Sequence, residues 1–169
     1  MRRVLIIGCP GAGKTTFAKS LAEKTGLPLV HLDQLYWNGQ WEHLSREEFD
    51  RVLQIELEKP EWIIDGNYDR TLPHRLQYCD KVFFFDLPRV ACLWGITQRM
   101  LQHYGKSRDD MGGHCPERFD RNKWQLCRFI WEFPKKNRKK YYDLLKASQD
   151  LTVFRNRKQV EKYLKEAVF

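Results

Sequence analysis

Gly8-Cys9-Pro10-Gly11-Ala12-Gly13-Lys14-Thr15 matches the pattern G-x-x-x-x-G-K-[ST] at every position. The glycines of this pattern let backbone N–H groups turn inward around phosphate oxygens, while the lysine reaches the outer phosphates and the hydroxyl binds Mg2+. The stretch therefore predicts a phosphate-binding loop. The residues expected around the phosphates are Gly8, Pro10, Gly11, Ala12, Gly13, Lys14, Thr15 and Thr16.

The segments on either side of the loop agree with this interpretation. Residues 4–7 are aliphatic, as in a buried strand, and Phe17 and Leu21 lie four residues apart, as on the buried face of a helix. A helix that begins at the loop would point its N-terminus at the anion. The alternatives are a chance match in a glycine-rich turn and a dinucleotide-binding turn, but the latter needs a glycine where Thr16 stands.

The length and composition indicate one globular unit. The chain has 169 residues, about the size of one domain, and it contains no apolar stretch long enough to cross a bilayer. Met1-Arg2-Arg3 precedes only a short apolar run, so we expect no secretory signal and a cytoplasmic protein. The five cysteines show no C-x-x-C spacing, which favours reduced thiols.

The net charge of +8 is concentrated in residues 118–140, where nine lysines and arginines face two acidic residues. A segment of this kind predicts an anionic partner. A nucleotide meets that requirement, and so does the backbone of a nucleic acid. The alternative is a basic helix face that is merely solvated.

Apolar runs alternate with helical patterns along the chain. Unbroken apolar runs are typical of parallel strands covered on both faces. The pattern predicts a three-layer α/β fold in which a parallel sheet lies between layers of helices. The predicted strands are residues 4–7, 28–32, 62–64, 81–85 and 151–154.

Three further helices are predicted after the one that follows the phosphate-binding loop. Ser45 and Glu48 form a capping box at the start of one helix. A second helix begins near Pro88, and its apolar face is expected to run from Val90 to Tyr104. The last helix follows Asn156.

Asp33, Asp65 and Asp86 each follow a predicted strand. Ligands of parallel sheets bind beyond the carboxyl ends of the strands, so we expect these carboxylates near the loop. Asp65 is the candidate to hold the metal together with Thr15, and Asp33 the candidate to orient or deprotonate an acceptor hydroxyl. The alternative for all three is a turn or a helix cap, and Asp86 fits that alternative best.

Aromatic residues follow Asp33 in a polar loop. Tyr36, Trp37 and Trp41 are placed to stack on a flat acceptor. The alternative is a small hydrophobic cluster beneath a long loop.

The segment around 105–120 is polar and glycine-bearing, as a mobile lid would be. Arginines carried by a lid stabilise the charge of a transferring phosphoryl group, because the guanidinium fork matches two oxygens. Arg99, Arg108 and Arg118 are the candidates. The alternative is that they are ordinary surface arginines.

In its order of elements the chain resembles the adenylate-kinase-related P-loop kinases. More narrowly, the segments 31–37, 62–68 and 105–118 resemble the bacterial DNA topology modulation proteins. The wider resemblance implies ATP and Mg2+ as ligands, a five-stranded sheet of order 2-3-1-4-5 and a lid-like helical insertion. It also matches Asp65 to the Asp of the Asp-Gly-Phe-Pro-Arg segment of adenylate kinases and Arg70 to its arginine, although the Phe-Pro is missing here.

The acceptor side looks nearer to shikimate and gluconate kinases, in which a carboxylate after the second strand meets acceptor hydroxyls. We therefore expect a single kinase-like domain over residues 1–169 that transfers the γ-phosphoryl group of Mg-ATP to a nucleotide or another small acceptor. The alternatives are a DNA-associated regulator that keeps a nucleotide pocket and an ATPase that serves a partner. The residues expected to bind the acceptor are Asp33, Tyr36, Trp37, Asp65, Gly66 and Arg70.

Overall fold

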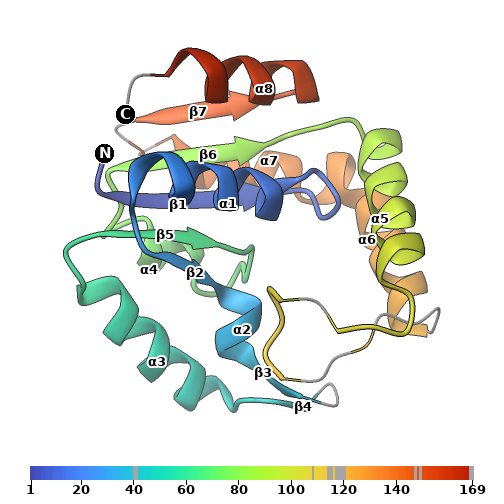
Figure 1. Ribbon diagram of the computed structural model, residues 1–169, viewed down its shortest axis with the longest axis horizontal. Helices are drawn as coiled ribbons and strands as arrows, with labels where there is room; N and C mark the ends of the chain where they lie inside the picture. Colours follow the sequence, from blue (N-terminus) through green and yellow to red (C-terminus); the bar gives the residue numbers. More distant parts are fainter. Residues whose placement is uncertain are drawn as a thin grey trace.

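The computed structural model describes residues 1–39, 42–107, 109–113, 116, 121–146, 148 and 150–167. A five-stranded parallel sheet forms its centre, with the order β2-β5-β1-β6-β7 (Figure 1). Counted along the chain, these strands have the order 2-3-1-4-5, so the expected fold is confirmed. The strands are β1 (Arg3–Gly8), β2 (Leu29–His31), β5 (Trp62–Asp65), β6 (Lys81–Phe85) and β7 (Leu151–Phe154).

Helices cover both faces of the sheet. Figure 1 shows α1 and α8 over one face, with α4 and α7 behind the other. A separate antiparallel hairpin is made of β3 (Trp37–Gly39) and β4 (Glu42–His43). The helices are α1 (Lys14–Thr25), α2 (Leu32–Tyr36), α3 (Arg46–Glu58), α4 (Leu72–Arg75), α5 (Arg89–His103), α6 (Arg121–Lys136), α7 (Arg138–Leu145) and α8 (Arg157–Glu166).

Strand β6 contributes to the core on both sides of the sheet. Phe83 packs edge-on against Phe17 of α1, with 4.9 Å between ring centroids. Phe84 stacks on Tyr141 of α7 with 5.6 Å between centroids. Successive side chains of a strand point to opposite faces, so an unbroken aromatic run fills both layers. All five residues of β6 are buried, as the apolar pattern predicted.

The start of α3 follows from its local sequence. The Ser45 hydroxyl accepts a hydrogen bond from Glu48 N at 3.2 Å, and the Glu48 carboxylate accepts one from Ser45 N at 3.0 Å. Both orphan donors of the first turn are thereby satisfied. The predicted capping box is confirmed.

The second strand is shorter than predicted. β2 ends at His31, where its ladder with β5 also ends at Asp65. The chain then turns directly into the short helix α2, so Asp33 lies in the first turn of a helix and not at the end of a strand. Apolar residues at 28–32 indicate burial, but they do not distinguish the last residue of a strand from the first of a helix.

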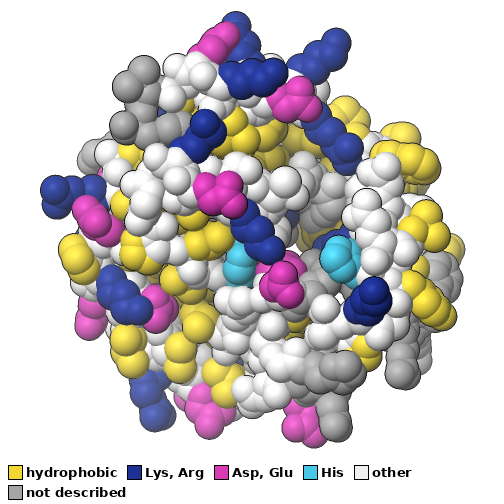
Figure 2. Space-filling model, in the orientation of Figure 1, with side chains coloured by type: hydrophobic (Ala, Val, Ile, Leu, Met, Phe, Trp, Pro, Cys, Tyr) yellow, Lys and Arg dark blue, Asp and Glu magenta, His cyan; other side chains and the backbone are white. Residues whose placement is uncertain are grey.

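The predicted inner face of α5 is wrong in part, although Leu93 and Met100 from that face do pack against the core. Cys92 and Ile96 are buried, whereas Val90, Trp94 and Leu101 are 68%, 58% and 78% exposed. Hydrophobic side chains are visible along the edge of the molecule where α5 lies (Figure 2). The helix carries apolar residues on more than one side, so periodicity alone does not determine which stripe packs inward.

The basic segment is built into the fold. Its described part forms α6 and the start of α7, and its residues Ile130 and Phe133 are buried. Pro134 lies in the last turn of α6, and the helix ends shortly after it. Within the described ranges, none of the helices combines the length and the apolar character needed to span a membrane.

Candidate active site

The phosphate-binding loop connects β1 to α1 and presses closely against its neighbours. Gly8 has φ +135°, and a Cβ there would lie 2.3 Å from the carbonyl oxygen of Phe85. Gly11 has φ +78°, and a Cβ there would lie 2.2 Å from the carbonyl oxygen of Cys92. Both positions therefore require glycine. The loop residues 10–16 line a cavity of about 1000 Å³, whereas Gly8 lies beneath it.

Lys14 folds back over the loop. Its ammonium donates hydrogen bonds to the carbonyl oxygens of Gly8, at 3.0 Å, and Cys9, at 3.1 Å. Burial lowers the pKa of Lys14, and the nearby carboxylate of Asp65 acts in the opposite direction. A half-buried ammonium whose hydrogen bonds go to carbonyl oxygens is well suited to bind an anion.

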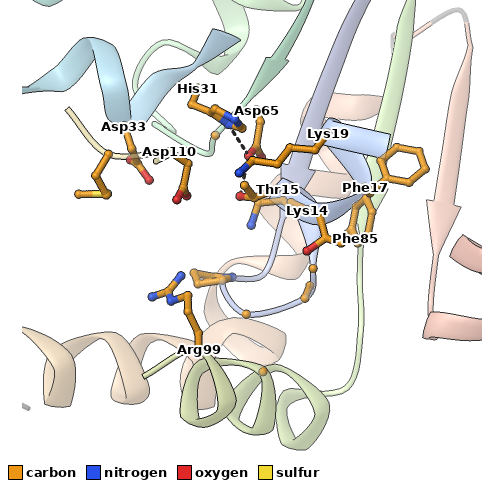
Figure 3. A pocket seen from close by; sticks show the side chains of 18 of the residues that line it. Lys14, Thr15, Phe17, Lys19, His31, Asp33, Asp65, Phe85, Arg99 and Asp110 are labelled. Carbon is orange, nitrogen blue, oxygen red and sulfur yellow. Dashed lines mark hydrogen bonds and ion pairs between the residues drawn. The ribbon is translucent and has the colours of Figure 1, made fainter. Parts of the chain in front are cut away.

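Asp65 is the centre of a buried polar group beside the loop. Its Oδ2 accepts a 2.8 Å hydrogen bond from the Thr15 hydroxyl and lies 3.2 Å from Nδ1 of His31 (Figure 3). Asp65 and His31 are each 6% exposed. A hydroxyl and a carboxylate are ligands that Mg2+ accepts, so these two oxygens fit a shared metal ion. His31 was not recognised from the sequence.

The residues after Asp65 join the loop to the acceptor side. Asn67 Oδ1 accepts a 3.0 Å hydrogen bond from the backbone N–H of Gly8. The Tyr68 hydroxyl donates a 2.8 Å hydrogen bond to Asp33 Oδ1. Burial, and after it the Asp33 carboxylate, raises the pKa of Tyr68, so its hydroxyl remains a donor. Adjacent residues thus contact the two halves of the site.

Asp33 faces the same cavity as Lys14 and Thr15 (Figure 3). A second cavity of about 410 Å³ adjoins this site, and the two share Asp33, Trp37 and Tyr68 in their walls. Gly66 lines the larger cavity. The structure thus brings together Asp33, Trp37, Asp65 and Gly66 from the predicted acceptor residues.

Tyr36 and Arg70 line the smaller cavity and are held by other residues. The Tyr36 ring stacks on His43 with 5.0 Å between centroids. The guanidinium of Arg70 forms a bidentate pair with Asp50 of α3, at 2.8 Å and 2.7 Å. Trp41 lies outside the described residues.

Among the predicted arginines, Arg99 lines the large cavity and extends from α5 toward the loop (Figure 3). Arg108 and Arg118 lie outside the described residues. Asp86 accepts hydrogen bonds from Nε of Arg138 at 2.7 Å and from the Tyr142 hydroxyl at 3.0 Å. This carboxylate therefore ties α7 to the end of β6. It does not cap α5, whose N-terminus has no side-chain cap hydrogen bond.

The cavity contains charged residues that the sequence patterns did not single out. Asp110, 7% exposed, comes from the predicted lid segment, and Lys123 comes from α6. Lys19 and Arg157 come from α1 and α8. These residues lie in four separate parts of the chain. They share no apolar periodicity and no glycine spacing, so no sequence pattern marks them as one group.

Two groups of known proteins are similar to this chain in sequence. Residues 4–83, less than half of the chain, match the family described as "ATPase family associated with various cellular activities (AAA)". An adenylate kinase of Clavibacter michiganensis subsp. michiganensis is 30% identical over 112 residues, which cover 64% of this chain and 54% of the relative. An adenylate kinase of Thermotoga neapolitana is 30% identical over 109 residues, covering 63% and 49%. The chain spans about half the length of these relatives.

Solved structures of shikimate kinases share its architecture. The enzyme from Bacteroides thetaiotaomicron superposes with a TM-score of 0.57 at 19% identity, covering 97% of this chain and 94% of the other. The enzyme from Acinetobacter baumannii, in complex with shikimate, gives 0.58 at 16% identity, covering 98% and 92%. At this identity the likeness concerns the fold. The chain therefore has the three-layer α/β fold of P-loop nucleoside-triphosphate-binding proteins.

Proposed function

We propose that this protein is an ATP- and Mg2+-dependent phosphotransferase that transfers the γ-phosphoryl group to a small acceptor, either a nucleotide or a compound with a free hydroxyl. The observation that carries the proposal is the placement of Asp33 across one cavity from Lys14 and the Thr15–Asp65 pair. Phosphoryl transfer depends mainly on positioning and on neutralising charge. This cavity has groups for both tasks.

The donor half is formed by the loop and its partners. Backbone N–H groups of residues 11–16 would surround the phosphates, and Lys14 would exchange its carbonyl contacts for phosphate oxygens. Thr15 and Asp65 would hold Mg2+, which when bound neutralises phosphate charge. Arg99 is the described arginine that we assign to the transferring group, and Arg108 and Arg118 remain candidates.

The acceptor half is formed around Asp33. The Tyr68 hydroxyl donates a 2.8 Å hydrogen bond to Asp33 Oδ1 and so orients the carboxylate that would accept the proton of an acceptor hydroxyl. Trp37 and Tyr36 supply flat walls, and Arg46 and Arg70 supply positive charge in the adjoining cavity. Positive charge beside aromatic walls fits an acceptor that carries an anionic group.

Several broader statements belong to the same proposal. We assign the activity to one domain over residues 1–169 and to the cytoplasm. The cysteines among the described residues are free thiols, as expected in a reducing compartment. The narrower resemblance to DNA topology modulation proteins is supported by the segments 31–37, 62–68 and 105–118, each of which contributes described residues to the walls of the two cavities.

An acceptor panel tests the proposal. The protein is incubated with Mg-ATP and with nucleosides, nucleotides, shikimate, gluconate and related sugar acids, and ADP formation is followed. We expect ADP formation that depends on one class of acceptor. Equal ADP formation with and without every acceptor would indicate instead an ATPase that serves a partner.

Lys14→Ala, with Lys24→Ala on the same helix as control, tests the donor half separately. We expect Lys14→Ala to weaken ATP binding at least about tenfold, because a charge-assisted bond to phosphate is lost. Lys24 is exposed at the far end of α1, so the control should bind ATP like the wild type. Unchanged ATP binding in Lys14→Ala would contradict the proposed site.

A second candidate function is binding of nucleic acid through α6. Trp124, Arg128, Trp131 and Lys135 follow one another at spacings of four, three and four residues, which places them on one face of the helix. Trp124 and Trp131 are 68% and 52% exposed. Exposed rings alternating with cations are the pattern that stacks bases and binds phosphates.

Much of the basic charge, including that of Arg128, is compensated within the fold. Arg128 and Lys136 both pair with Glu132, and Arg138 and Lys140 pair with other acidic residues. The test is binding of duplex and single-stranded oligonucleotides at rising salt, with Arg128→Ala and Trp131→Ala compared with the wild type. Nucleic-acid binding should weaken steeply with salt and in both variants. Absence of binding at low salt would remove this candidate.

A further inference from the structure

Arg75, the last residue of α4, places a cation directly beneath the segment that joins the two halves of the site. Its side chain is completely buried. One terminal nitrogen donates to the carbonyl oxygen of Gly66 at 2.9 Å, and the other donates to those of Asn67 and Tyr68, the latter at 3.2 Å. Three consecutive carbonyls therefore share one guanidinium.

This arrangement is energetically unusual. Within the described parts of the chain, no carboxylate forms an ion pair with Arg75, and its Nε is buried without a hydrogen-bond partner. Burial lowers the pKa of Arg75 to about 10. Removing a guanidinium from water without a paired carboxylate disfavours folding, so the three carbonyl bonds must offset a large desolvation term.

The backbone that Arg75 holds is itself strained. Gly66 has φ +146°, and Tyr68 has φ +38°, a left-handed conformation that non-glycine residues rarely adopt. A strained conformation of this kind persists only where the surroundings determine it strongly. Arg75 supplies that support from the side of the turn opposite to the cavity.

The other side of the turn carries the contacts of the site. Asp65 precedes the turn and binds Thr15, Asn67 holds the phosphate-binding loop through Gly8, and Tyr68 holds Asp33. A shift of the turn would therefore move donor and acceptor groups together. Arg75, which holds the carbonyls of this turn, can therefore influence both halves of the site.

We propose that Arg75 is a positioning residue that keeps residues 65–68 in the conformation aligning the Thr15–Asp65 pair with Asp33. The proposal rests on the proposed function and extends it to a residue that touches neither substrate. The positioning acts through backbone carbonyls, which is why a planar fork with several donors stands at this position.

The variant Arg75→Met tests this role, with Arg75→Lys as the conservative change. Lys81→Met is the matched control, because Lys81 is also a buried cation, 9% exposed and bound to Asp150 Oδ1 at 2.5 Å, but lies at the opposite end of the sheet. The readouts are the ratio of ATP affinities with and without Mg2+, and amide hydrogen exchange of residues 65–69.

We expect Arg75→Met to reduce the gain in ATP affinity from Mg2+ about tenfold and to speed exchange of residues 65–69 at least tenfold, with an intermediate result for Arg75→Lys. Lys81→Met should lower the melting temperature but leave the ratio within about twofold of the wild type. If both methionine variants change the ratio equally, Arg75 is merely structural and the inference is wrong.

Should Arg75→Met fail to fold, Arg75→Lys and Asn67→Ala carry the test. Asn67→Ala retains the carbonyl bonds to Arg75 but removes the contact with Gly8, so it should also reduce the Mg2+ gain. If the ratio of ATP affinities with and without Mg2+ matches the wild type in both Arg75→Lys and Asn67→Ala, the inference is wrong. Absence of Mg-ATP binding in the wild-type protein would instead overturn the proposed function, so the two failures are distinguishable.

Discussion

The Thr15 hydroxyl donates a 2.8 Å hydrogen bond to Asp65 although the two residues lie 50 positions apart in the chain. Thr15 is the last residue of the loop motif and the second residue of α1, and Asp65 ends β5. Strands β1 and β5 are neighbours in the sheet, with Ile6 paired to Asp65. The sheet order therefore creates the pair that fits a metal ion.

Removal of the Thr15 hydroxyl should affect ATP binding only when Mg2+ is present. We expect Thr15→Val to weaken binding of Mg-ATP about tenfold, because one oxygen bound to a charged group is lost. Thr25→Val is the control, since its hydroxyl bonds to Leu21 at the far end of the same helix. Affinities measured by titration with Mg2+ and with a chelator give the comparison, and an equal loss in both conditions would contradict a metal site.

The ion pair between Arg70 and Asp50 should hold the Arg70 guanidinium away from a bound acceptor. Both side chains are 47% exposed, so breaking the pair should change stability by less than about 1 kcal/mol. If Arg70 binds the acceptor, Arg70→Ala raises the acceptor KM about tenfold, and Asp50→Asn lowers it. Steady-state kinetics with the acceptor found in the panel measure this, with Arg51→Ala as a neighbouring control. An unchanged KM in Arg70→Ala would remove Arg70 from the acceptor site.

Gly112 should be required for the lid segment to rest on the acceptor side. Its N–H donates to the carbonyl oxygen of Asp33 at 3.3 Å, and a Cβ there would lie 1.7 Å from the carbonyl oxygen of Trp37. Gly112→Ala must therefore displace residues 109–113. We expect faster amide exchange in that segment and an acceptor KM raised about tenfold.

Gly105→Ala is the control for this variant. Gly105 has φ +72° but no atom within 4 Å of an added Cβ, so the substitution strains the backbone without displacing a neighbour. Exchange of residues 109–113 should remain at the wild-type rate. If Gly112→Ala also exchanges at that rate, the closed position of the segment does not depend on this contact.

The buried Tyr141 and the half-buried Tyr68 should make the protein sensitive to alkali. Burial raises the pKa of Tyr68 and of Tyr141, with added contributions from Asp33 and Asp69. In the unfolded chain a tyrosine ionises near pH 10. A folded pKa above the unfolded one leaves the free energy of unfolding unaffected below about pH 10 and lowers it above that pH.

The free energy of unfolding should therefore fall less steeply above pH 10 when Tyr141 is replaced by Phe. The expected difference in slope is about 1.4 kcal/mol per pH unit. Urea unfolding at a series of pH values from 8 to about 11 measures the slope. Tyr104→Phe is the control, because Tyr104 is 66% exposed. Identical slopes for Tyr141→Phe and the wild type would show that Tyr141 does not resist ionisation.

The sheet and the phosphate-binding loop were predictable because their signals are local. Strand β6 is a run of aromatic residues, and Gly8 and Gly11 stand where a backbone turn leaves no room for a side chain. The inward face of α5 was not predictable in this way. Both its faces carry apolar residues, and the choice of Cys92 and Ile96 over Trp94 depends on the loop and sheet against which the helix packs.

The candidate site also combines residues that a local sequence pattern marks with residues that only the fold brings together. Asp33 and Asp65 were marked by their positions after apolar runs, although Asp33 proved to lie in a helix, and Trp37 was marked as an aromatic residue in a polar stretch. His31 and Asp110 carried no such mark, because a single polar residue has no periodicity. Their place in the cavity depends on elements that meet only in the folded chain.

By itself the sequence determined the donor half, since glycines at set spacings, a lysine and a hydroxyl constrain the backbone of one short segment. Only the tertiary structure decided how that half meets the acceptor side. The bonds from Tyr68 to Asp33 and from Arg75 to residues 66–68 join residues on different elements or around a strained turn. Their formation depends on packing of the whole sheet and its helices, which no local pattern encodes.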